Sequence, residues 1–353
     1  LTGGGTAGHV TPNIALLPAL QAAGYEIAYV GSYEGIEKKL IADFNIPYTG
    51  ISTGKFRRYL DPKNFSDPFR VMKGFVEARN YLKNYQPDVV FSKGGFVSVP
   101  VVRAAASLHI PCIIHESDMT PGLANKLCIP VAEKVCCNFP ETMNNIPADK
   151  AVLTGSPIRA ELAQGSKLAG LNMCGFTANK PVIMVIGGSL GAANVNKAVR
   201  DALPKLLEDF QVVHLCGKDK IDNLLLNTPG YKQFEYIKAE LKDIFAMADV
   251  VISRAGANAI CELLALKKPN ILIPLPAASS RGDQLLNAAS FEAQGYSIVL
   301  NEDDITTNLL VDKVHELYFN RQNYVDAMSK SHQMDAVKTI MELINAAAEK
   351  KKN

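Results

Sequence analysis

The sequence has no apolar run of about 18 residues, the length that a membrane-spanning helix needs. We also recognise no secretory signal peptide. The formal net charge is only +2, and no dense basic stripe with interleaved base-stacking aromatics is present. These absences indicate that nothing spans a membrane and that nucleic acid is not a partner. We expect a globular protein with a substantial core.

The seven cysteines are odd in number, and no two of them have C-x-x-C spacing. A disulfide framework is therefore not predicted. We expect reduced thiols that are mostly buried as small hydrophobic side chains, as in a cytosolic protein.

Two further absences concern chemistry. An NAD-type Rossmann domain places a carboxylate at the end of its second strand, but the corresponding strand here ends in Gly31 and Ser32. Metal-dependent nucleotide-sugar enzymes often carry an Asp-x-Asp pair, and the sequence contains none. We therefore expect no nicotinamide cofactor, no metal and no other cofactor.

The sequence does contain an alternation of apolar strands, glycine turns and helices. Continuous Val, Ile and Leu strands that alternate with helices are typical of parallel sheets covered on both faces. The predicted strands lie within residues 25–31, 87–95, 110–118, 210–217, 248–256 and 269–276, and at the start of 180–203.

The length of 353 residues exceeds the usual size of a single core and predicts two domains. Glycine loops at residues 3–8 and 187–191 each open one strand–helix series, so both domains are predicted to be Rossmann-like. We place the first domain at residues 1–157 and the second at residues 158–332. The C-terminal segment, residues 333–353, is expected to return to the first domain.

This C-terminal segment is predicted to be a packed helix, because its apolar residues fall on one helical face. The hinge between the domains is expected at residues 154–162. The first glycine loop begins only two residues after the start of the sequence, so most of a preceding strand is expected to be missing. The apolar residues of the C-terminal segment are Val337, Ile340, Met341 and Ile344.

Glycine loops between a strand and a helix are suited to anions, because they present backbone N–H groups and the positive end of a helix dipole. In open α/β sheets such ligands bind beyond the carboxyl ends of the strands. Two such loops predict two phosphorylated ligands, with their charge neutralised by N–H groups, Ser189 and Arg159.

Two residues near these loops are candidate general bases. His9 follows the first glycine loop at the start of a helix, where the helix dipole favours a neutral imidazole that accepts a proton. The alternative is a histidine that only bonds a nearby carbonyl. Glu116 is the other candidate, with helix capping or ion pairing as its alternative, and its neighbour His115 is expected to pack or to orient other groups. Glu262 either bonds sugar hydroxyls or is simply exposed.

Seven segments combine these features: GGGTAGHVTPNIAL, FSKGGFVSVP, IIHESDMTPGLANK, LTGSPIRAEL, VIGGSLGAANVNKA, SRAGANAICELLAL and SRGDQLLNA. In this order and spacing they resemble the MurG family of bacterial UDP-N-acetylglucosamine transferases. The resemblance extends over nearly the whole chain, and the combination of motifs is specific although each glycine loop alone is not.

The resemblance implies an α/β protein of the GT-B fold, with two Rossmann-like domains and parallel sheets around a deep interdomain cleft. It also implies a C-terminal domain that binds UDP-GlcNAc. The loop with Ser189 would face the diphosphate, Glu262 the ribose, and Asp283 with Gln284 the GlcNAc hydroxyls. The implied donor contacts are Arg159, Gly188, Ser189, Gly191, Ala257, Glu262, Asp283 and Gln284.

The N-terminal glycine loops would then bind the diphosphate of the acceptor, with His9 or Glu116 as the catalytic base. The sequence departs from the commoner family pattern at Leu190, where many relatives have glutamine, and at Asp118, where many have asparagine. We carry no sugar contact onto Asp118. The implied acceptor contacts are Gly5, Thr6, Ala7, Gly8, Gly94 and Gly95.

The function that the resemblance implies is inverting transfer of GlcNAc from UDP-GlcNAc to the 4-hydroxyl of the MurNAc of lipid I, the undecaprenyl-diphosphate-linked MurNAc-peptide. The product would be lipid II for peptidoglycan. The alternatives are an enzyme like UDP-GlcNAc 2-epimerase and a non-catalytic regulator that binds nucleotide sugars. The expected location is the cytoplasmic face of the cell membrane, as a peripheral protein, with cell-wall synthesis and division proteins as possible partners.

Residues 55–83 are predicted to contact an anionic membrane surface, because they carry eight basic and three acidic residues with interleaved aromatics. Two apolar stripes run along the predicted helix, and only one of them can enter the core. The alternative is that both stripes pack internally and the charges are solvated. The proposed membrane residues are Arg57, Arg58, Phe65, Phe69 and Arg70.

Overall fold

The computed structural model describes residues 1–54, 63–188, 191–277, 282–331 and 335–352, with backbone alone for 63–68 and 352. The chain forms two compact units. The first unit is Leu1–Arg159 with Asp335–Asn353, and the second unit is Ala160–Met334. The sequence placed these divisions after residues 157 and 332. No helix among the described residues is long and apolar enough to cross a membrane.

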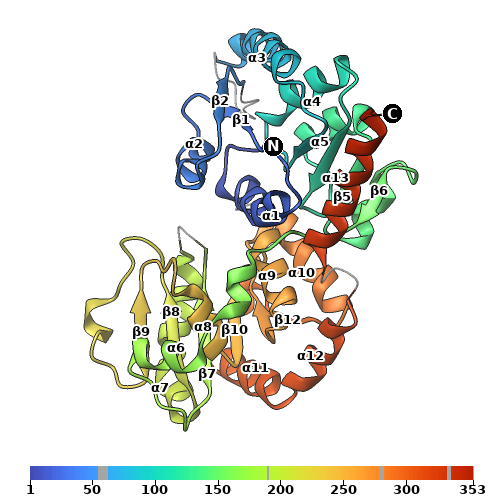
Figure 1. Ribbon diagram of the computed structural model, residues 1–353. Helices are drawn as coiled ribbons and strands as arrows, with labels where there is room; N and C mark the ends of the chain where they lie inside the picture. Colours follow the sequence, from blue (N-terminus) through green and yellow to red (C-terminus); the bar gives the residue numbers. More distant parts are fainter. Residues whose placement is uncertain (55–62, 189–190, 278–281, 332–334, 353) are drawn as a thin grey trace. The chain divides into compact units, whose positions relative to one another are not determined.

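The first unit is built on parallel strands (Figure 1). β3 to β6 form a four-stranded sheet in that order, and β1 pairs with β2. Thr2 makes parallel bridges to both Val30 of β1 and Ser92 of β3, so the first residues of the chain lie between the two sheets. The strands are β1 Tyr29–Ser32, β2 Tyr48–Ile51, β3 Val90–Ser92, β4 Cys112–Glu116, β5 Lys134–Cys137 and β6 Ala151–Leu153.

Helices cover both faces of this sheet because its strand residues are apolar in both directions. Val90 and Ile114 belong to the core cluster under α3 and α4, whereas Phe91 and Ile113 pack with residues of α1 and α13. The helices are α1 Thr11–Ala22, α2 Ile36–Ile41, α3 Lys63–Tyr85, α4 Ser98–Ser107, α5 Leu123–Cys128 and α13 Ala336–Lys352; the 3₁₀ turns are η1 Ala7–His9, η2 Ala42–Phe44, η3 Ile129–Val131 and η4 Pro140–Asn145.

The C-terminal helix α13 lies against α1, as Figure 1 shows. Ile340, Met341 and Ile344 are buried there, and Val337 is partly buried. This confirms the packed helix that the apolar periodicity predicted.

The second unit has a six-stranded parallel sheet in the order β12-β11-β10-β7-β8-β9. If the strands are numbered from 1 to 6 along the chain and the sheet is read from β9, the order is 3-2-1-4-5-6, as in a Rossmann fold. The direction of this order reverses between β7 and β10. Thr2, between β1 and β3, marks the same reversal in the first unit. The strands are β7 Val182–Ile186, β8 Gln211–Leu215, β9 Tyr231–Phe234, β10 Val250–Ser253, β11 Asn270–Leu272 and β12 Ser297–Val299.

The helices of the second unit are amphipathic, and α7 and α11 bury apolar residues in one core with the strands. These helices are α6 Lys167–Cys174, α7 Ala193–Asp209, α8 Leu241–Met247, α9 Ala257–Ala265, α10 Asp283–Ala293, α11 Thr307–Phe319 and α12 Arg321–Ser329; the 3₁₀ turns are η5 Ala160–Gln164, η6 Asn223–Leu225 and η8 Glu302–Asp304.

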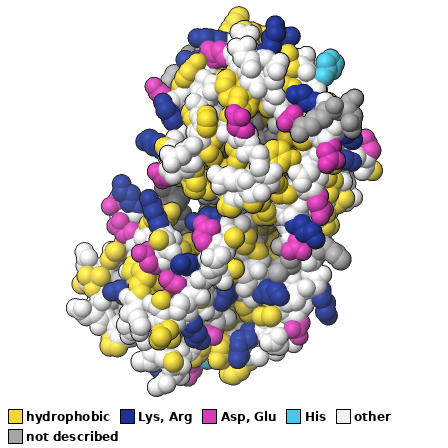
Figure 2. Space-filling model, viewed as in Figure 1, with side chains coloured by type: hydrophobic (Ala, Val, Ile, Leu, Met, Phe, Trp, Pro, Cys, Tyr) yellow, Lys and Arg dark blue, Asp and Glu magenta, His cyan; other side chains and the backbone are white. Residues whose placement is uncertain are grey.

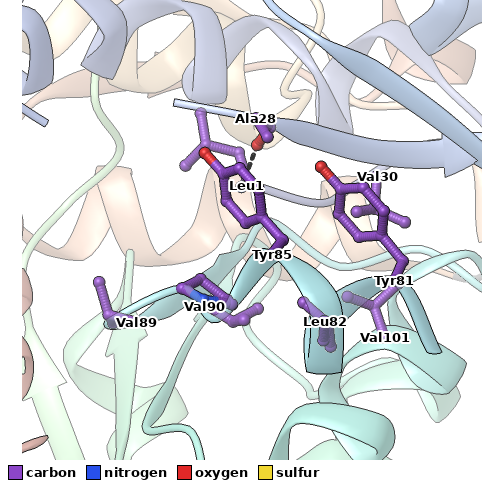
Figure 3. A pocket seen from close by; sticks show the side chains of 10 residues that line it. Leu1, Ala28, Val30, Tyr81, Leu82, Tyr85, Val89, Val90 and Val101 are labelled. Atoms are coloured by element: carbon purple, nitrogen blue, oxygen red, sulfur yellow. Dashed lines mark hydrogen bonds between the residues drawn. The ribbon is translucent and has the colours of Figure 1, made fainter. Parts of the chain in front are cut away.

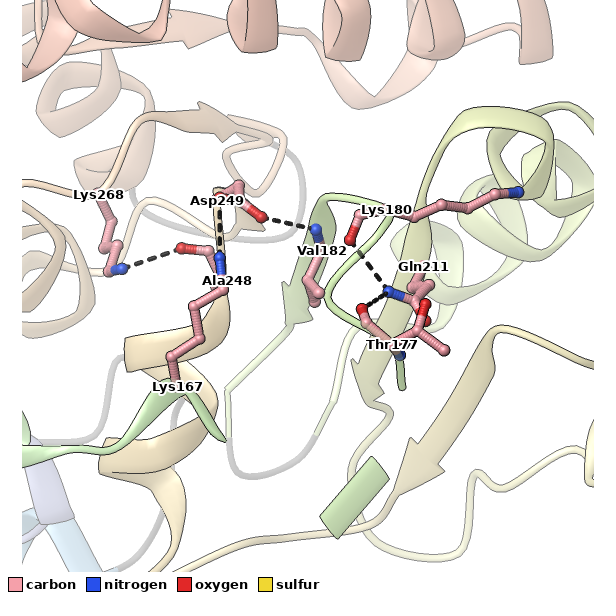
Figure 4. Close-up of polar contacts among 8 residues, drawn as sticks. All are labelled: Lys167, Thr177, Lys180, Val182, Gln211, Ala248, Asp249 and Lys268. Carbon is pink, nitrogen blue, oxygen red and sulfur yellow. Dashed lines mark hydrogen bonds and ion pairs between the residues drawn. The ribbon is translucent and has the colours of Figure 1, made fainter. Parts of the chain in front are cut away.

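Polar contacts close the amino-terminal edge of this second sheet (Figure 4). Asp249 accepts a hydrogen bond from the Val182 N–H at 2.8 Å and pairs with Lys167 at 3.7 Å. Lys268 donates to the Ala248 carbonyl at 2.9 Å, and its burial lowers the pKa of its ammonium. These contacts lie at the edge opposite to the one where ligands bind, so we interpret them as structural.

A small apolar pocket lies at the amino-terminal side of the first sheet (Figure 3). Tyr81 and Tyr85 of α3 form one wall, and Leu1 and Val30 contribute to the others. All seven cysteines are buried and free, as the sequence predicted. Burial raises the pKa of the Cys112 thiol to about 12, so it stays protonated.

Candidate active site

The loops at the carboxyl ends of the first unit's strands contact one another. The Gly4 N–H donates to the Gly94 carbonyl at 3.3 Å. A Cβ on Gly95 would lie 2.2 Å from the Gly4 carbonyl oxygen, and the φ of Gly95 is +83°. Only glycine fits there, because a side chain would push the two loops apart. The two predicted N-terminal glycine loops therefore form one surface at the strand-order reversal.

The Gly5 N–H is already used within the chain. It donates to the Glu37 carboxylate at 3.1 Å, and the same carboxylate accepts from the Ser32 N–H at 2.9 Å and from the Ser32 hydroxyl. Glu37 is fully buried, and a Cβ on Gly4 would lie 2.5 Å from its carboxyl carbon. Burial alone would raise the pKa of Glu37, but these hydrogen bonds outweigh burial and leave the pKa below its usual value. Gly5 therefore does not offer the ligand the free N–H expected from its spacing.

His9 ends the 3₁₀ turn η1, and only Val10 separates it from α1. Its side chain is half-buried, and its Nδ1 lies 3.0 Å from the Thr6 hydroxyl. Two buried side chains fix the start of the first glycine loop: the Tyr29 hydroxyl donates to the Gly3 carbonyl, and the Asn13 amide donates to the Thr2 carbonyl. His9 is thus held just before the start of α1.

Glu116 is almost fully buried and accepts three hydrogen bonds. The donors are the Asp118 N–H at 2.9 Å, the Gly122 N–H at 3.0 Å and the Asn125 amide at 2.8 Å. Burial raises its pKa. Gly122 is the N-cap residue of α5, so this carboxylate holds the loop and the helix start. The geometry favours the capping alternative for Glu116 and leaves His9 as the better candidate base.

A buried lysine, which the sequence analysis did not single out, connects three loops. Lys93 Nζ lies 2.7 Å from His115 Nδ1 and 2.6 Å from the Ser117 hydroxyl, and His115 Nε2 lies 2.8 Å from the Gly155 carbonyl. An ammonium only donates and a carbonyl only accepts, so His115 carries its proton on Nε2. Burial and the charge of Lys93 hold the pKa of His115 well below its usual value.

In the second unit, the loop after β7 begins at the strand-order reversal between β7 and β10. The Gly191 N–H donates to the Gly188 carbonyl at 2.9 Å, and both glycines have positive φ. A Cβ on Gly191 would lie 1.9 Å from the Cys216 carbonyl oxygen, which excludes any side chain. Ser189 and Leu190 lie outside the described residues.

The predicted sugar and ribose residues lie on α9 and α10. Ala257 begins α9 after the N-cap Gly256, and Glu262 is half-buried further along this helix. Asp283 and Gln284 begin α10, and Gln284 Oε1 accepts from the Leu275 N–H at 3.1 Å. The loop after β11 and the start of α10 are therefore joined by Gln284.

Arg254, which sequence reasoning missed, fixes the same edge. It pairs with Glu302 and donates to the carbonyls of Ile273 at 3.0 Å and Pro274 at 3.2 Å. Arg254 directly follows the buried strand β10, and this position in the sequence could have indicated a residue at the ligand-binding edge. Arg159 is the last residue of the first unit, and its Nε has no hydrogen-bond partner among the described residues.

Comparisons with known proteins match nearly the whole chain. The glycosyltransferase family 28 N-terminal domain matches residues 1–137, and the C-terminal domain of that family matches residues 182–344. The UDP-N-acetylglucosamine–N-acetylmuramyl-(pentapeptide) pyrophosphoryl-undecaprenol N-acetylglucosamine transferase of Lachnospira eligens is 64% identical over 344 residues, which cover 98% of this chain and 97% of that protein. The chain belongs to glycosyltransferase family 28.

A second relative and two solved structures are also similar to this chain. The protein of the same name from Clostridium botulinum is 58% identical, again with 98% of this chain and 97% of that protein covered. The MurG structure of Acinetobacter baumannii is 28% identical with a TM-score of 0.77 and covers 98% of both chains. The UDP-GlcNAc 2-epimerase structure from Methanocaldococcus jannaschii, at 14% identity and a TM-score of 0.68, covers 96% of this chain and 97% of that chain and shares the fold alone. The relatives favour the transferase over the epimerase alternative.

Proposed function

We propose that this chain transfers GlcNAc from UDP-GlcNAc to the 4-hydroxyl of the MurNAc of lipid I. The observation that carries the proposal is the 64% identity, over nearly the full length, to a transferase named for this reaction. The strand-order reversals of both units, each with a glycine loop, supply the two anion-binding edges that a donor and an acceptor diphosphate need.

We assign the donor to the second unit. Gly188 and Gly191 adopt positive φ in the loop after β7, and α9 begins after the neighbouring strand β10. Backbone N–H groups and a helix dipole at this edge would stabilise the diphosphate of the departing UDP, together with Arg159. Glu262 would bond the ribose, and Asp283 and Gln284 the sugar.

We assign the acceptor to the first unit, where His9 acts as the general base. The 4-oxygen of MurNAc attacks the anomeric carbon of GlcNAc, His9 takes the hydroxyl proton, and the bond from that carbon to the UDP oxygen breaks. This single displacement inverts the anomeric centre. His9 is preferred because the Glu116 carboxylate is held by three donors, two from the loop that follows it and one from α5.

The membrane surface is assigned to α3, where one apolar stripe is uncovered. Phe69 is 79% exposed and Met72 is 64% exposed, whereas Ala78 and Leu82 are buried in the core. Arg70 is exposed beside them. Figure 2 shows hydrophobic and basic side chains together where Figure 1 places α3. Arg57 and Arg58 and the Phe65 side chain lie outside what the structure describes.

An exposed apolar stripe beside basic residues suits a membrane with anionic headgroups. Such a surface on the acceptor-binding unit would bring the enzyme to a lipid-linked substrate. Together with the family resemblance, this assignment supports a peripheral position on the cytoplasmic face of the cell membrane. Contacts with cell-wall synthesis and division proteins are an expectation from the family resemblance.

The decisive experiment incubates the protein with labelled UDP-GlcNAc and a short-chain lipid I analogue, with and without a chelator. Labelled disaccharide lipid and free UDP in equal amounts are expected in both arms. Conversion of UDP-GlcNAc to its 2-epimer without lipid would support the epimerase instead. Binding of UDP-GlcNAc without turnover would support a regulator, and product lost only with chelator would contradict the metal-independent displacement.

A further inference from the structure

Lys93 is an ionisable side chain that the proposed displacement does not use, although it lies among the acceptor loops. It is 1% exposed. The residue follows β3 directly and precedes the Gly94–Gly95 turn, while its Nζ reaches Ser117, just beyond β4. The ammonium is therefore located between two loops at the carboxyl edge of the sheet.

The contacts of Lys93 hold its charge in place. His115 Nδ1 and the Ser117 hydroxyl are neutral acceptors, so these two contacts hold the ammonium in place without adding a negative charge beside it. His115 is itself held by the Gly155 carbonyl at 2.8 Å. A charge that is fixed before a ligand arrives is more effective than a mobile one, because no side-chain ordering is needed on binding.

The surroundings of Lys93 explain why an acceptor loop would need a fixed cation. The Glu37 carboxylate lies against Gly4 and Gly5 of the neighbouring loop, so the surface already includes one buried anion. A Cβ on Gly3 would lie 3.2 Å from the Lys93 Cβ, which shows how closely lysine and loop approach. A diphosphate would add further negative charge at this position. A positive charge beneath it offsets that repulsion.

We propose that Lys93 is the buried cation that makes the acceptor site selective for a lipid-linked diphosphate. The inference rests on the assignment of the acceptor to the first unit. Lys93 acts through the electric field of its charge and through the Gly94–Gly95 turn and Ser117, so it is a positioning and specificity residue. The ligand class is a prenyl diphosphate ester, as distinct from the diphosphate of the nucleotide donor.

The test compares wild-type protein with Lys93→Met, which keeps the length of the side chain and removes its charge. Lys268→Met is the matched control, because Lys268 is a half-buried lysine that donates to a backbone carbonyl of the second unit. Calorimetric titrations use farnesyl diphosphate, farnesyl monophosphate and inorganic pyrophosphate, and steady-state assays give KM for UDP-GlcNAc and for the lipid I analogue.

We expect Lys93→Met to weaken farnesyl diphosphate binding and to raise the acceptor KM about tenfold or more, because the fixed charge and its hydrogen bond to Ser117 are both lost. The KM for UDP-GlcNAc and the behaviour of Lys268→Met should stay close to wild type. An equal rise in KM for UDP-GlcNAc and for the lipid I analogue, or an unchanged KM for the lipid I analogue, would overturn the inference. Wild-type binding of pyrophosphate as tight as that of farnesyl diphosphate would overturn the assignment to a lipid.

A measurement on the wild-type protein keeps the proposal testable if Lys93→Met does not fold. Ring ¹⁵N resonances of His115 report on its contact with Lys93. Farnesyl diphosphate should shift the Nδ1 resonance, and farnesol should not. Absence of a shift at saturating farnesyl diphosphate would refute the role of Lys93. If wild-type protein lacks transferase activity yet shows this shift, the proposed function fails and the cation site stands.

Discussion

The Glu37 carboxylate accepts the Gly5 N–H at 3.1 Å, across an interval of 32 residues. The G-x-G-x-x-G spacing predicts that the N–H groups of this loop bind the anion of a ligand. The Gly5 N–H instead binds a carboxylate of the protein itself. One N–H group serves one strong acceptor, so the ligand must use donors beyond Gly5. Glu37 then sets the shape of the loop that leads to His9.

Glu37→Gln should raise the acceptor KM and lower kcat, with little change in the donor KM. Its amide nitrogen would face either the Gly5 N–H or the Ser32 N–H, and an unmet buried donor costs about 1–3 kcal/mol, or roughly 5- to 150-fold. Glu34→Gln is the matched control, because Glu34 is exposed just before α2, the helix that carries Glu37. Equal kinetics for the two variants would show that the carboxylate does not position the loop.

His9→Ala should lower kcat by about 10²–10⁴, the usual contribution of general-base catalysis, with the donor affinity nearly unchanged. Glu116→Gln should mainly lower the melting temperature, because the carboxylate holds Gly122 and Asn125. Steady-state kinetics and thermal unfolding distinguish the two. Near wild-type kcat for His9→Ala, with a severe kcat loss in a stable Glu116→Gln, would reverse the assignment of the base.

Glu262→Ala should raise the KM for UDP-GlcNAc more than it lowers kcat, because a ribose contact is made equally in the ground and transition states. A crystal soaked with UDP should show the ligand against the loop after β7 and the start of α9. Density confined to residues 3–8 would refute the assignment of the donor to the second unit.

The free energy of unfolding should decrease as the pH is lowered below about 6.5, partly because of His214. Burial lowers the pKa of His214 to about 3 from its usual 6.5. Between these values the unfolded chain binds a proton that the folded chain does not, so stability is full above the unfolded pKa and is lost as pH falls. The slope is about 1.4 kcal/mol per pH unit for one such group.

His214→Gln tests this slope, because glutamine can donate to Asn196 and accept from Tyr231 as the imidazole does. Urea unfolding at about pH 7.5 and about pH 5 should show a smaller difference for the variant. Part of the slope should persist, since His115 is also buried with a lowered pKa. An unchanged slope would contradict a neutral His214.

Phe69→Ser combined with Arg70→Glu should weaken binding to vesicles that contain phosphatidylglycerol, and the wild-type binding should be salt-sensitive. Phe319→Ser with Arg321→Glu is the matched control, because Phe319 is 74% exposed on the second unit. Co-sedimentation measures both. Equal loss in the two variants, or no loss in the first, would exclude α3 as the membrane surface.

The repeated strand–loop–helix pattern was predictable because long apolar strands and glycine turns are local signals. The short strands β2, β5, β6, β9 and β12 were missed, since runs of only three or four residues give no clear periodicity, and some, such as Tyr231–Phe234, also contain polar residues. Most of a strand was expected to be missing before the first glycine loop. In the structure, Thr2 takes the place of that strand and makes bridges to Val30 and Ser92. Burial of a charge depends on distant neighbours, so Glu37 and Lys93 could not be found from spacing.

The division of the chain has a consequence for its synthesis. Helix α13 completes the face of the first unit that α1 begins, yet it leaves the ribosome only after the whole of the second unit. The second unit is continuous and can fold as soon as its last helices, α11 and α12, emerge. The first unit instead waits with Leu16 and Leu20 uncovered until Ile340 and Ile344 arrive. The half that is made first is therefore the half that is finished last, and it is the one exposed to chaperones and to aggregation in the meantime.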